Sequence, residues 1–316
     1  MSKDTPGSPL RSLRPADAST VEMRSSRPSR GPGGSIGPIL SPLDLLGTRL
    51  GNYCLERVLG RGRMGVVYFA TDEALLRPTA LKVLHWRIPQ PCDQDPEAWF
   101  LSEARSMARI NHPHVIQIYG AAKQAGHCHI AMEFVDGASA SALIARFGAF
   151  PADRATEVLV HAASALYAAH AADVVHCDVK AENLLIAANG TAKLGDFGMA
   201  RQGARNRANA PVRAGTPLYT APELWAGEPP SPATDLYALG VTYFYLLTGR
   251  HPLEGGTIDC IKAAHLEAPV PDVRTLSPHV PAGCSHVLRR CLAKSPRDRY
   301  SSAQVLVWDA LALLRK

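Results

Sequence analysis

The sequence predicts an α+β fold in two lobes, a small strand-rich lobe followed by a larger helical one. Residues 53–68 form two extended runs around a glycine-rich turn, and another extended run covers 79–84. Beyond Gly137 the chain is mostly helical, with alanine-rich periodic segments at 152–172 and 232–248. The cleft between two such lobes is the natural place for a ligand.

Local chemistry predicts the elements between these landmarks. Asp95, Pro96 and Glu97 are typical of a helix N-terminus, because Asp caps the first turn, Pro fits its first position and Glu complements the helix dipole. After the turn residues at 111–113, two short strands reach Phe134. The sequence has no internal repeat.

The N-terminal segment differs in composition from the rest of the chain. The whole chain has 316 residues, of which 46% are hydrophobic and 20% charged, so most of it can bury a core. Residues 1–48 are rich in Ser, Pro, Gly and Arg, and burial there cannot offset the entropy of ordering. We therefore expect a disordered tail at 1–48 and a folded domain at 49–316, with a small lobe at 49–134 and a large lobe at 135–316.

Charge and cysteine content limit the partners and the compartment. The net charge is +6, and the arginine-rich tail suits an acidic partner, although a solvated charge run is the simpler interpretation. No aromatic residues alternate with those arginines, which disfavours nucleic acid as a partner. Seven cysteines without a C-x-x-C pair indicate reduced thiols and a cytoplasmic protein. The most apolar segment, 236–247, is about half the length of a membrane span, so we expect none.

Glycines follow Leu59 in the pattern G-x-G-x-x-G-x-V, at Gly60, Gly62 and Gly65. This spacing alone is weak, because glycines also serve ordinary tight turns. A dinucleotide-binding loop would open a helix, whereas these glycines precede a β-branched run that includes Val67. The pattern therefore favours a hairpin whose backbone can approach phosphate groups.

Lys82 and Glu103 are charged residues in apolar surroundings. Lys82 shares a strand face with Ala80, from which it could neutralise phosphate groups in the cleft. The simpler interpretation of Lys82 alone is a solvated lysine at a strand edge. Glu103 falls in an apolar helical stripe, where an unpaired carboxylate is costly. An ion pair between Lys82 and Glu103 explains both positions.

Two runs carry the most specific pattern. His176–Asn183 is His-Cys-Asp-Val-Lys-Ala-Glu-Asn, and Leu194–Gly198 is Leu-Gly-Asp-Phe-Gly. With the glycines and the strand lysine before them, they occur in the order of a known signature set. The chain resembles the eukaryotic-type (Hanks-type) serine/threonine protein kinase family from about Tyr53 to its C-terminus, and its Ala and Arg content favours a bacterial member. Gly215–Glu223 resembles the substrate-docking loop of that family, whose glutamate pairs with an arginine matched here by Arg299.

The resemblance implies a bilobal protein kinase fold that binds ATP in the cleft. The catalytic residues it implies are Asp178, which orients the acceptor hydroxyl and takes its proton, Lys180, which steadies the γ-phosphate, Lys82, which holds the α- and β-phosphates, and Glu103, which braces Lys82. The metal ligands it implies are Asn183 and Asp196, for Mg²⁺ or for Mn²⁺ in its place. The residues expected around ATP are Leu59, Gly60, Gly62, Gly65, Val67, Ala80, Lys82, Met132, Glu133, Val135 and Leu185. Phosphoryl transfer depends on positioning and charge stabilisation, which this set supplies.

The expected function is transfer of the ATP γ-phosphoryl group to Ser and Thr hydroxyls of proteins, the chain itself included. Lys180, two residues after Asp178, is the serine/threonine form of the loop. The alternative is a pseudokinase scaffold, which the intact metal and base residues disfavour. The sequence defines neither the physiological substrate nor the oligomeric state.

Two departures concern regulation. Cys177 replaces the arginine that precedes the catalytic aspartate in most regulated members, so the resemblance implies the non-RD subtype. That arginine normally receives an activation-loop phosphate. Residues 197–215 contain no Ser, Thr or Tyr. The arginine that would bind the phosphate and the hydroxyl that would carry it are therefore both missing. We expect activity that does not depend on phosphorylation in 197–215.

Overall fold

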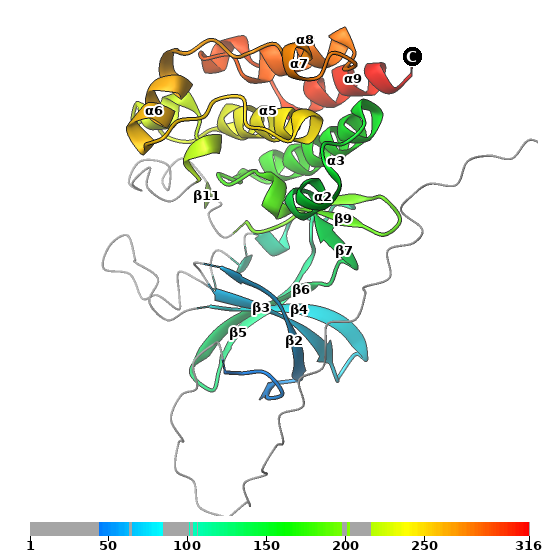
Figure 1. Cartoon of the computed structure of the whole chain (residues 1–316). Coiled ribbons are helices and arrows are strands. Elements are labelled where there is room, and N and C mark those ends of the chain that lie inside the picture. Colours follow the sequence, from blue (N-terminus) through cyan, green and yellow to red (C-terminus); the bar gives the residue numbers. More distant parts are fainter. Residues whose placement is uncertain are drawn as a thin grey trace, which may run out of the picture.

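The computed structural model describes residues 44–62, 65–84, 101, 104–105, 107–197, 201–202 and 216–315. Figure 1 shows a strand-rich lobe, coloured blue to green, below a helical lobe that runs from green to red. The arrangement confirms the predicted α+β fold in two lobes.

The small lobe is one antiparallel sheet with strand order β1-β2-β3-β4-β6-β5. Its strands are β1 (Arg49–Leu50), β2 (Tyr53–Gly62), β3 (Gly65–Asp72), β4 (Arg77–Leu84), β5 (Ile118–Gln124) and β6 (His127–Glu133). Side chains alternate along β3, so Val66, Tyr68 and Ala70 are buried on one face. They form a small core with Leu55 of β2 and Leu81 of β4. The predicted hairpin and the two strands that reach Phe134 are confirmed.

Residues 44–48 pack on this sheet, although their composition assigns them to the tail. Leu45 is only 3% exposed and joins the small core. The backbone of Gly47 donates to Leu55 O at 2.8 Å, and the backbone of Leu55 donates to Thr48 O at 3.0 Å. Residues 45–48 therefore pack with the folded unit, because one buried leucine and two backbone bonds fix the segment.

The helix predicted to begin at Asp95 is described only in part, since residues 85–100 lie outside the described residues. Leu101, Ala104 and Met107 are helical, and Ala104 and Met107 are buried in the large core. Glu103 also lies outside the described residues, so its pairing with Lys82 stays a prediction.

The large lobe is built around two long helices. Its elements are β7 (Gly137–Ser139), α2 (Ala140–Phe147), α3 (Ala152–Ala171), β8 (Val174–Val175), η2 (Ala181–Asn183), β9 (Leu184–Ala187), β10 (Ala192–Leu194), β11 (Arg201–Gln202), η5 (Pro217–Tyr219), α4 (Pro222–Trp225), α5 (Pro232–Thr248), α6 (Ile258–Glu267), α7 (Val273–Leu276), α8 (Ala282–Cys291), η6 (Pro296–Asp298) and α9 (Ala303–Leu314). Helix α3 packs against α5 and α9. The helices predicted at 152–172 and 232–248 are confirmed, to within a residue at their ends.

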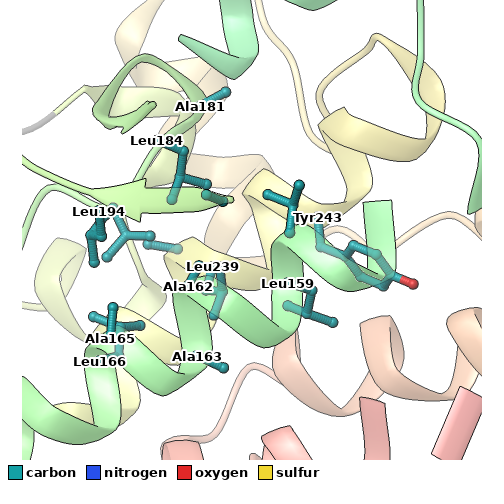
Figure 2. Packing of buried hydrophobic residues seen from close by; sticks show 14 of the residues in the cluster. Leu159, Ala162, Ala163, Ala165, Leu166, Ala181, Leu184, Leu194, Leu239 and Tyr243 are labelled. Atoms are coloured by element: carbon teal, nitrogen blue, oxygen red, sulfur yellow. The ribbon is translucent and has the colours of Figure 1, made fainter. Parts of the chain in front are cut away.

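Packing around α3 explains its alanines and leucines. Small alanines on the buried face bring neighbouring helices and strands close, and leucines fill the space that remains. Figure 2 shows Leu159 and Leu166 of α3 in one cluster with Leu184, Leu194 and Leu239. The core therefore extends from the helices to the strands β9 and β10 that carry the loops of the site.

Helix α5 has clear start and stop chemistry. Ser231 and Thr234 form a capping box, Pro232 takes the first helical position, and Gly249 ends the helix with a φ of +70°. Most of its residues are buried, so it is a central element of the lobe rather than a surface helix. Within the described part of the chain, no helix combines the length and the apolar character needed to cross a membrane.

Candidate active site

The loop after β8 is held by the first turn of α5. Asp235 is fully buried, and its carboxylate accepts hydrogen bonds from the backbone of His176 and of Cys177, both at 2.9 Å, and from His170 Nε2 at 2.8 Å. Cys177 adopts a φ of +64°, which is costly for a residue with a side chain. The carboxylate stabilises this strained turn and so fixes the residue that follows, Asp178.

Asp178, Lys180 and Asn183 form one hydrogen-bonded group on this loop. Lys180 Nζ donates to Asp178 Oδ2 at 2.7 Å and to Thr216 Oγ1 at 3.2 Å. Asn183 Nδ2 donates to Asp178 O at 2.8 Å and to Asp178 Oδ2 at 3.1 Å. The group places a carboxylate, an ammonium and an amide within contact of each other.

Asp196 faces this group from the loop after β10. The backbone of Gly195 donates to Asn183 O at 2.9 Å, which ties the two loops together. Lys82 of β4 pairs with Asp196, and their side chains are 12% and 43% exposed. Burial raises the pKa of Asp196, but the Lys82 ammonium outweighs it and holds the pKa below its usual range. Asp196 is therefore an ionised carboxylate at neutral pH.

His176 packs behind both loops and is a structural residue. It is fully buried, its Nε2 lies 3.1 Å from Gly195 O, and its Nδ1 accepts from the backbone of Asp178 at 3.2 Å. Its ring contacts Phe197, with the centroids 4.3 Å apart. Burial lowers the pKa of His176, so the imidazole is neutral with its proton on Nε2. It joins the two loops and carries no catalytic charge.

The sheet brings together most of the residues expected to contact ATP from the small lobe. Val67 pairs with Gly60 on one side and with Lys82 on the other, and Ala80 pairs with Met132. Leu59 is exposed at 38% near the glycines. Val135 follows β6 and is buried, and Leu185 comes from β9 of the large lobe, where it pairs with Ser139 and Lys193.

The three glycines of the loop differ in the space that a Cβ atom would find at each position. At Gly65 a Cβ would lie 2.1 Å from Val83 O, so the sheet itself requires glycine there. At Gly60 a Cβ would meet no atom within 4 Å, and at Gly62 it would meet only Gly65 O at 3.9 Å. Packing does not require glycine at these two positions, which leaves the backbone open to a ligand such as phosphate.

The oxygen atoms at the site fit a hard divalent cation. Asp196 offers a half-exposed carboxylate. The amide nitrogen of Asn183 donates its hydrogen bonds to Asp178. The amide oxygen of Asn183 is therefore the atom that could bind a metal ion. Carboxylate and amide oxygens suit Mg²⁺ and Mn²⁺. The described residues, those of this site included, contain no group of three or more His, Cys, Asp or Glu side chains placed to hold a metal ion, so protein groups alone would supply only part of the coordination here.

Two contacts at the site carry no sequence signal. Lys193 Nζ contacts Glu133 Oε1 at 2.9 Å and so joins β10 to the end of β6. His170 on α3 forms a hydrogen bond with Asp235 in the first turn of α5. Asp235 and Glu133 lie in patterns that the sequence shows, but their partners His170 and Lys193 do not, because both pairings depend on how distant elements pack.

The segment 216–223 is anchored at its far end by a buried ion pair. Arg299 donates from Nη1 to Glu223 Oε1 and from Nη2 to Oε2, both at 2.7 Å. Their side chains are 0% and 4% exposed. The predicted pairing of these residues is confirmed.

The fold and the site define a class of protein, and the comparisons agree with it. The sequence matches the family described as protein kinase domain over residues 53–309. The chain belongs to the protein kinase family. It is 28% identical to the crystal structure of the Mycobacterium tuberculosis PknI kinase domain, with a TM-score of 0.66 over 84% of this chain and 98% of that one.

Two similar curated proteins come from bacteria. The chain is 36% identical over 284 residues to serine/threonine-protein kinase Pkn1 of Myxococcus xanthus, which covers 85% of this chain and 40% of Pkn1. It is 33% identical over 267 residues to serine/threonine-protein kinase PrkC of Bacillus subtilis, which covers 84% of this chain and 41% of PrkC. The chain thus spans about two fifths of the length of these relatives. Their origin agrees with the predicted bacterial branch of the family.

Proposed function

We propose that this chain is a serine/threonine protein kinase that transfers the γ-phosphoryl group of ATP to Ser and Thr hydroxyls of proteins, its own included. The observation that carries the proposal is the group in which Asp178 Oδ2 accepts from both Lys180 Nζ and Asn183 Nδ2. Family membership and the names of the relatives support it. A pseudokinase scaffold finds no support, because each charged group of the catalytic loop is present and oriented.

The geometry suggests a role for each residue. The Asp178 carboxylate orients the acceptor hydroxyl and takes its proton as the new oxygen–phosphorus bond forms, while the bond between the γ-phosphorus and the β,γ-bridging oxygen breaks and ADP leaves. Lys180, already beside Asp178, neutralises charge on the transferred group, and Lys82 does so on the α- and β-phosphates. Asn183 and Asp196 would hold Mg²⁺ or Mn²⁺, which offsets charge on the phosphates.

The test uses the full chain with Mg²⁺, labelled ATP and a generic protein substrate. Asp178→Asn keeps the shape of the side chain but removes the proton acceptor, and we expect it to slow transfer by about 10²–10⁴-fold. Asp153→Asn, the same change at an exposed position of α3, serves as the matched control. ATP binding by the native chain without transfer to any Ser or Thr would refute the proposal and favour the scaffold.

We further propose that activity does not depend on phosphorylation in 197–215, as expected for a non-RD kinase. Cys177 Sγ lies 3.5 Å from Val175 O, and a thiol cannot replace a guanidinium as a phosphate receptor. Thr216, the next hydroxyl along the chain, accepts a hydrogen bond from Lys180. Phosphatase-treated enzyme should therefore retain its activity. A loss of activity on phosphatase treatment, with the responsible site mapped between 197 and 215, would contradict this.

Partners and compartment are proposed from the sequence. The substrates are proteins with Ser or Thr acceptors, and the basic tail suits an acidic partner. The six described cysteines form no disulfide with one another, which supports a cytoplasmic location.

A further inference from the structure

Arg57, Phe69 and Phe134 form a stack of side chains to which the proposed mechanism gives no role. The rings of Phe69 and Phe134 meet edge to face, with their centroids 4.8 Å apart and their planes at 84°. The Arg57 guanidinium lies over both rings, 4.6 Å from the centroid of Phe69 and 5.7 Å from that of Phe134. Rings in this arrangement attract each other, and a guanidinium is attracted to the face of a ring. We call this group the Arg57 stack.

The Arg57 stack lies on the face of the small-lobe sheet that is turned toward the large lobe. Phe69 of β3 pairs with Arg57 of β2 on one side and with Ala80 of β4 on the other. Paired residues of neighbouring strands, and residues two positions apart in one strand, share a face. That face also carries Lys82, which pairs with Asp196 of the large lobe, and the small core occupies the opposite face. The stack therefore continues the row of side chains expected around ATP.

The stack joins two segments that are not neighbours in the sheet. Strands β3 and β4 lie between β2 and β6. Phe134 follows the last residue of β6 and stands between Glu133 and Val135, both of which are expected to contact ATP. Arg57 lies on β2, three residues before Gly60. The Arg57 side chain therefore links the glycine hairpin to the segment after β6 across two strands.

The pairing of β2 is irregular on both sides of Arg57. The register of β2 against β3 shifts between Leu55 and Arg57 and again between Val58 and Gly60. Such irregularities bend a strand and interrupt its ladder of hydrogen bonds. At Gly60 a Cβ would meet no atom within 4 Å, so side-chain packing does not hold the hairpin there. The Arg57 stack therefore anchors the strand just before it opens into the glycines.

We propose that Arg57 is a positioning residue for ATP. Its guanidinium, held on Phe69 and Phe134, keeps the glycine hairpin close enough to the cleft for the backbone of Gly60 and Gly62 to bind the phosphates. The inference rests on the proposed kinase function, which places ATP in this cleft. It assigns to Arg57 an effect on the affinity for the phosphate groups, and no effect on the affinity for the nucleoside or for the protein substrate.

The first measurement compares the binding of MgATP and of adenosine to the full chain, and it needs no transfer. Arg57→Met keeps a long side chain that can cover the rings, but it removes the guanidinium. We expect it to raise the Kd for MgATP about two- to fivefold, the equivalent of one exposed cation–π contact, and to leave the Kd for adenosine unchanged. An unchanged Kd for MgATP, or an equal rise for both ligands, would overturn the inference.

Arg77→Met is the matched control, because it removes the same kind of contact from the same sheet. The Arg77 guanidinium lies 3.5 Å from the centroid of the Tyr119 ring, and Arg77 pairs with Asp72 at the far end of β3 from the glycines. This variant should lower the Tm at least as much as Arg57→Met and leave the Kd for MgATP unchanged. If it weakened MgATP binding as much as Arg57→Met, a loss of small-lobe stability would explain both results and the positioning role would be wrong.

A double-mutant cycle with Phe69→Leu separates stacking from a direct contact between Arg57 and a phosphate. If Arg57 acts through the ring, Arg57→Met should change the Kd for MgATP less in a chain that already carries Phe69→Leu than in the native chain. A guanidinium that binds phosphate directly does not need the ring. The full native effect in the Phe69→Leu background would therefore refute the positioning role.

The proposed function and the role of Arg57 can fail separately. If the native chain bound MgATP but transferred no phosphate to protein, the proposed function would fail, and the binding data would still decide the role of Arg57. If the native chain were active and Arg57→Met bound MgATP as tightly as the native chain, the role of Arg57 alone would fail.

Discussion

Replacing Glu223 with glutamine tests the buried ion pair that anchors the end of the substrate-docking segment. Arg299 uses its whole guanidinium: two bonds of 2.7 Å reach Glu223, and three more reach the carbonyls of Ala293, Ala233 and Lys294 at 2.8, 2.9 and 3.0 Å. Thr234 Oγ1 adds a bond to Glu223 Oε1 at 3.0 Å. Glutamine has nearly the same shape, but it removes the charge and turns an N–H₂ group toward donors.

The expected loss follows from burial. Arg299 would remain as an uncompensated cation in a site with 0% side-chain exposure. Breaking a buried pair by removing one partner costs about 3–5 kcal/mol. At about 2–4 °C per kcal/mol, the Tm should fall by about 6–20 °C.

The assay is chemical and thermal unfolding of the native chain, Glu223→Gln and Glu157→Gln. Glu157 makes the same kind of pair with Arg154 at 2.6 Å, but its side chain is 47% exposed. Such an exposed helix pair contributes about 0.3–0.5 kcal/mol. If Glu223→Gln lost no more free energy of unfolding than Glu157→Gln, the reasoning from burial would be refuted.

Two further predictions concern the glycines and a histidine. Gly65→Ala should lower the free energy of unfolding by about 1–3 kcal/mol, because its Cβ would lie 2.1 Å from Val83 O. Gly60→Ala should leave the free energy of unfolding unchanged, because its Cβ would meet no atom within 4 Å, but it should raise the KM for ATP. Equal stability of the two variants would contradict this. Burial lowers the pKa of His161 to about 4, so the unfolded chain binds more protons below pH 6.5 and the free energy of unfolding should fall as the pH drops from 7 to 5. In His161→Phe this contribution should vanish from urea unfolding measured at pH 7 and pH 5, and an unchanged difference between the two pH values would disprove it.

Elements with a strong local pattern could be predicted from the sequence. The strand 65–72 alternates buried and accessible side chains, and the helix 152–171 repeats alanines and leucines at helical spacing. The catalytic loop could be located because His176–Asn183 combines rare residue types at fixed offsets. In each case the information lies within a few residues of the feature that it predicts.

Features that depend on tertiary packing could not be predicted. The composition near 45 is that of a tail, yet Leu45 is buried because the chain turns back onto β2. An exposed hairpin is the natural interpretation of His127–His129, but all three residues are buried in β6, a central strand of the sheet. The Lys193–Glu133 pair joins residues 60 positions apart. A buried position for a polar residue becomes visible only when the elements around it are known.

The loops of the site take their positions from one turn of α5. Asp235 holds the catalytic loop through His176 and Cys177. One residue earlier, Thr234 donates a hydrogen bond to Glu223, which anchors the substrate-docking segment. Tyr237 has the Arg299 guanidinium 4.8 Å from the centre of its ring, and its hydroxyl contacts His265 of α6. Because these residues lie on a buried helix with a capped start, the proton acceptor, the docking segment and α6 share one rigid base. A change that shifts this turn should therefore affect catalysis and protein binding together.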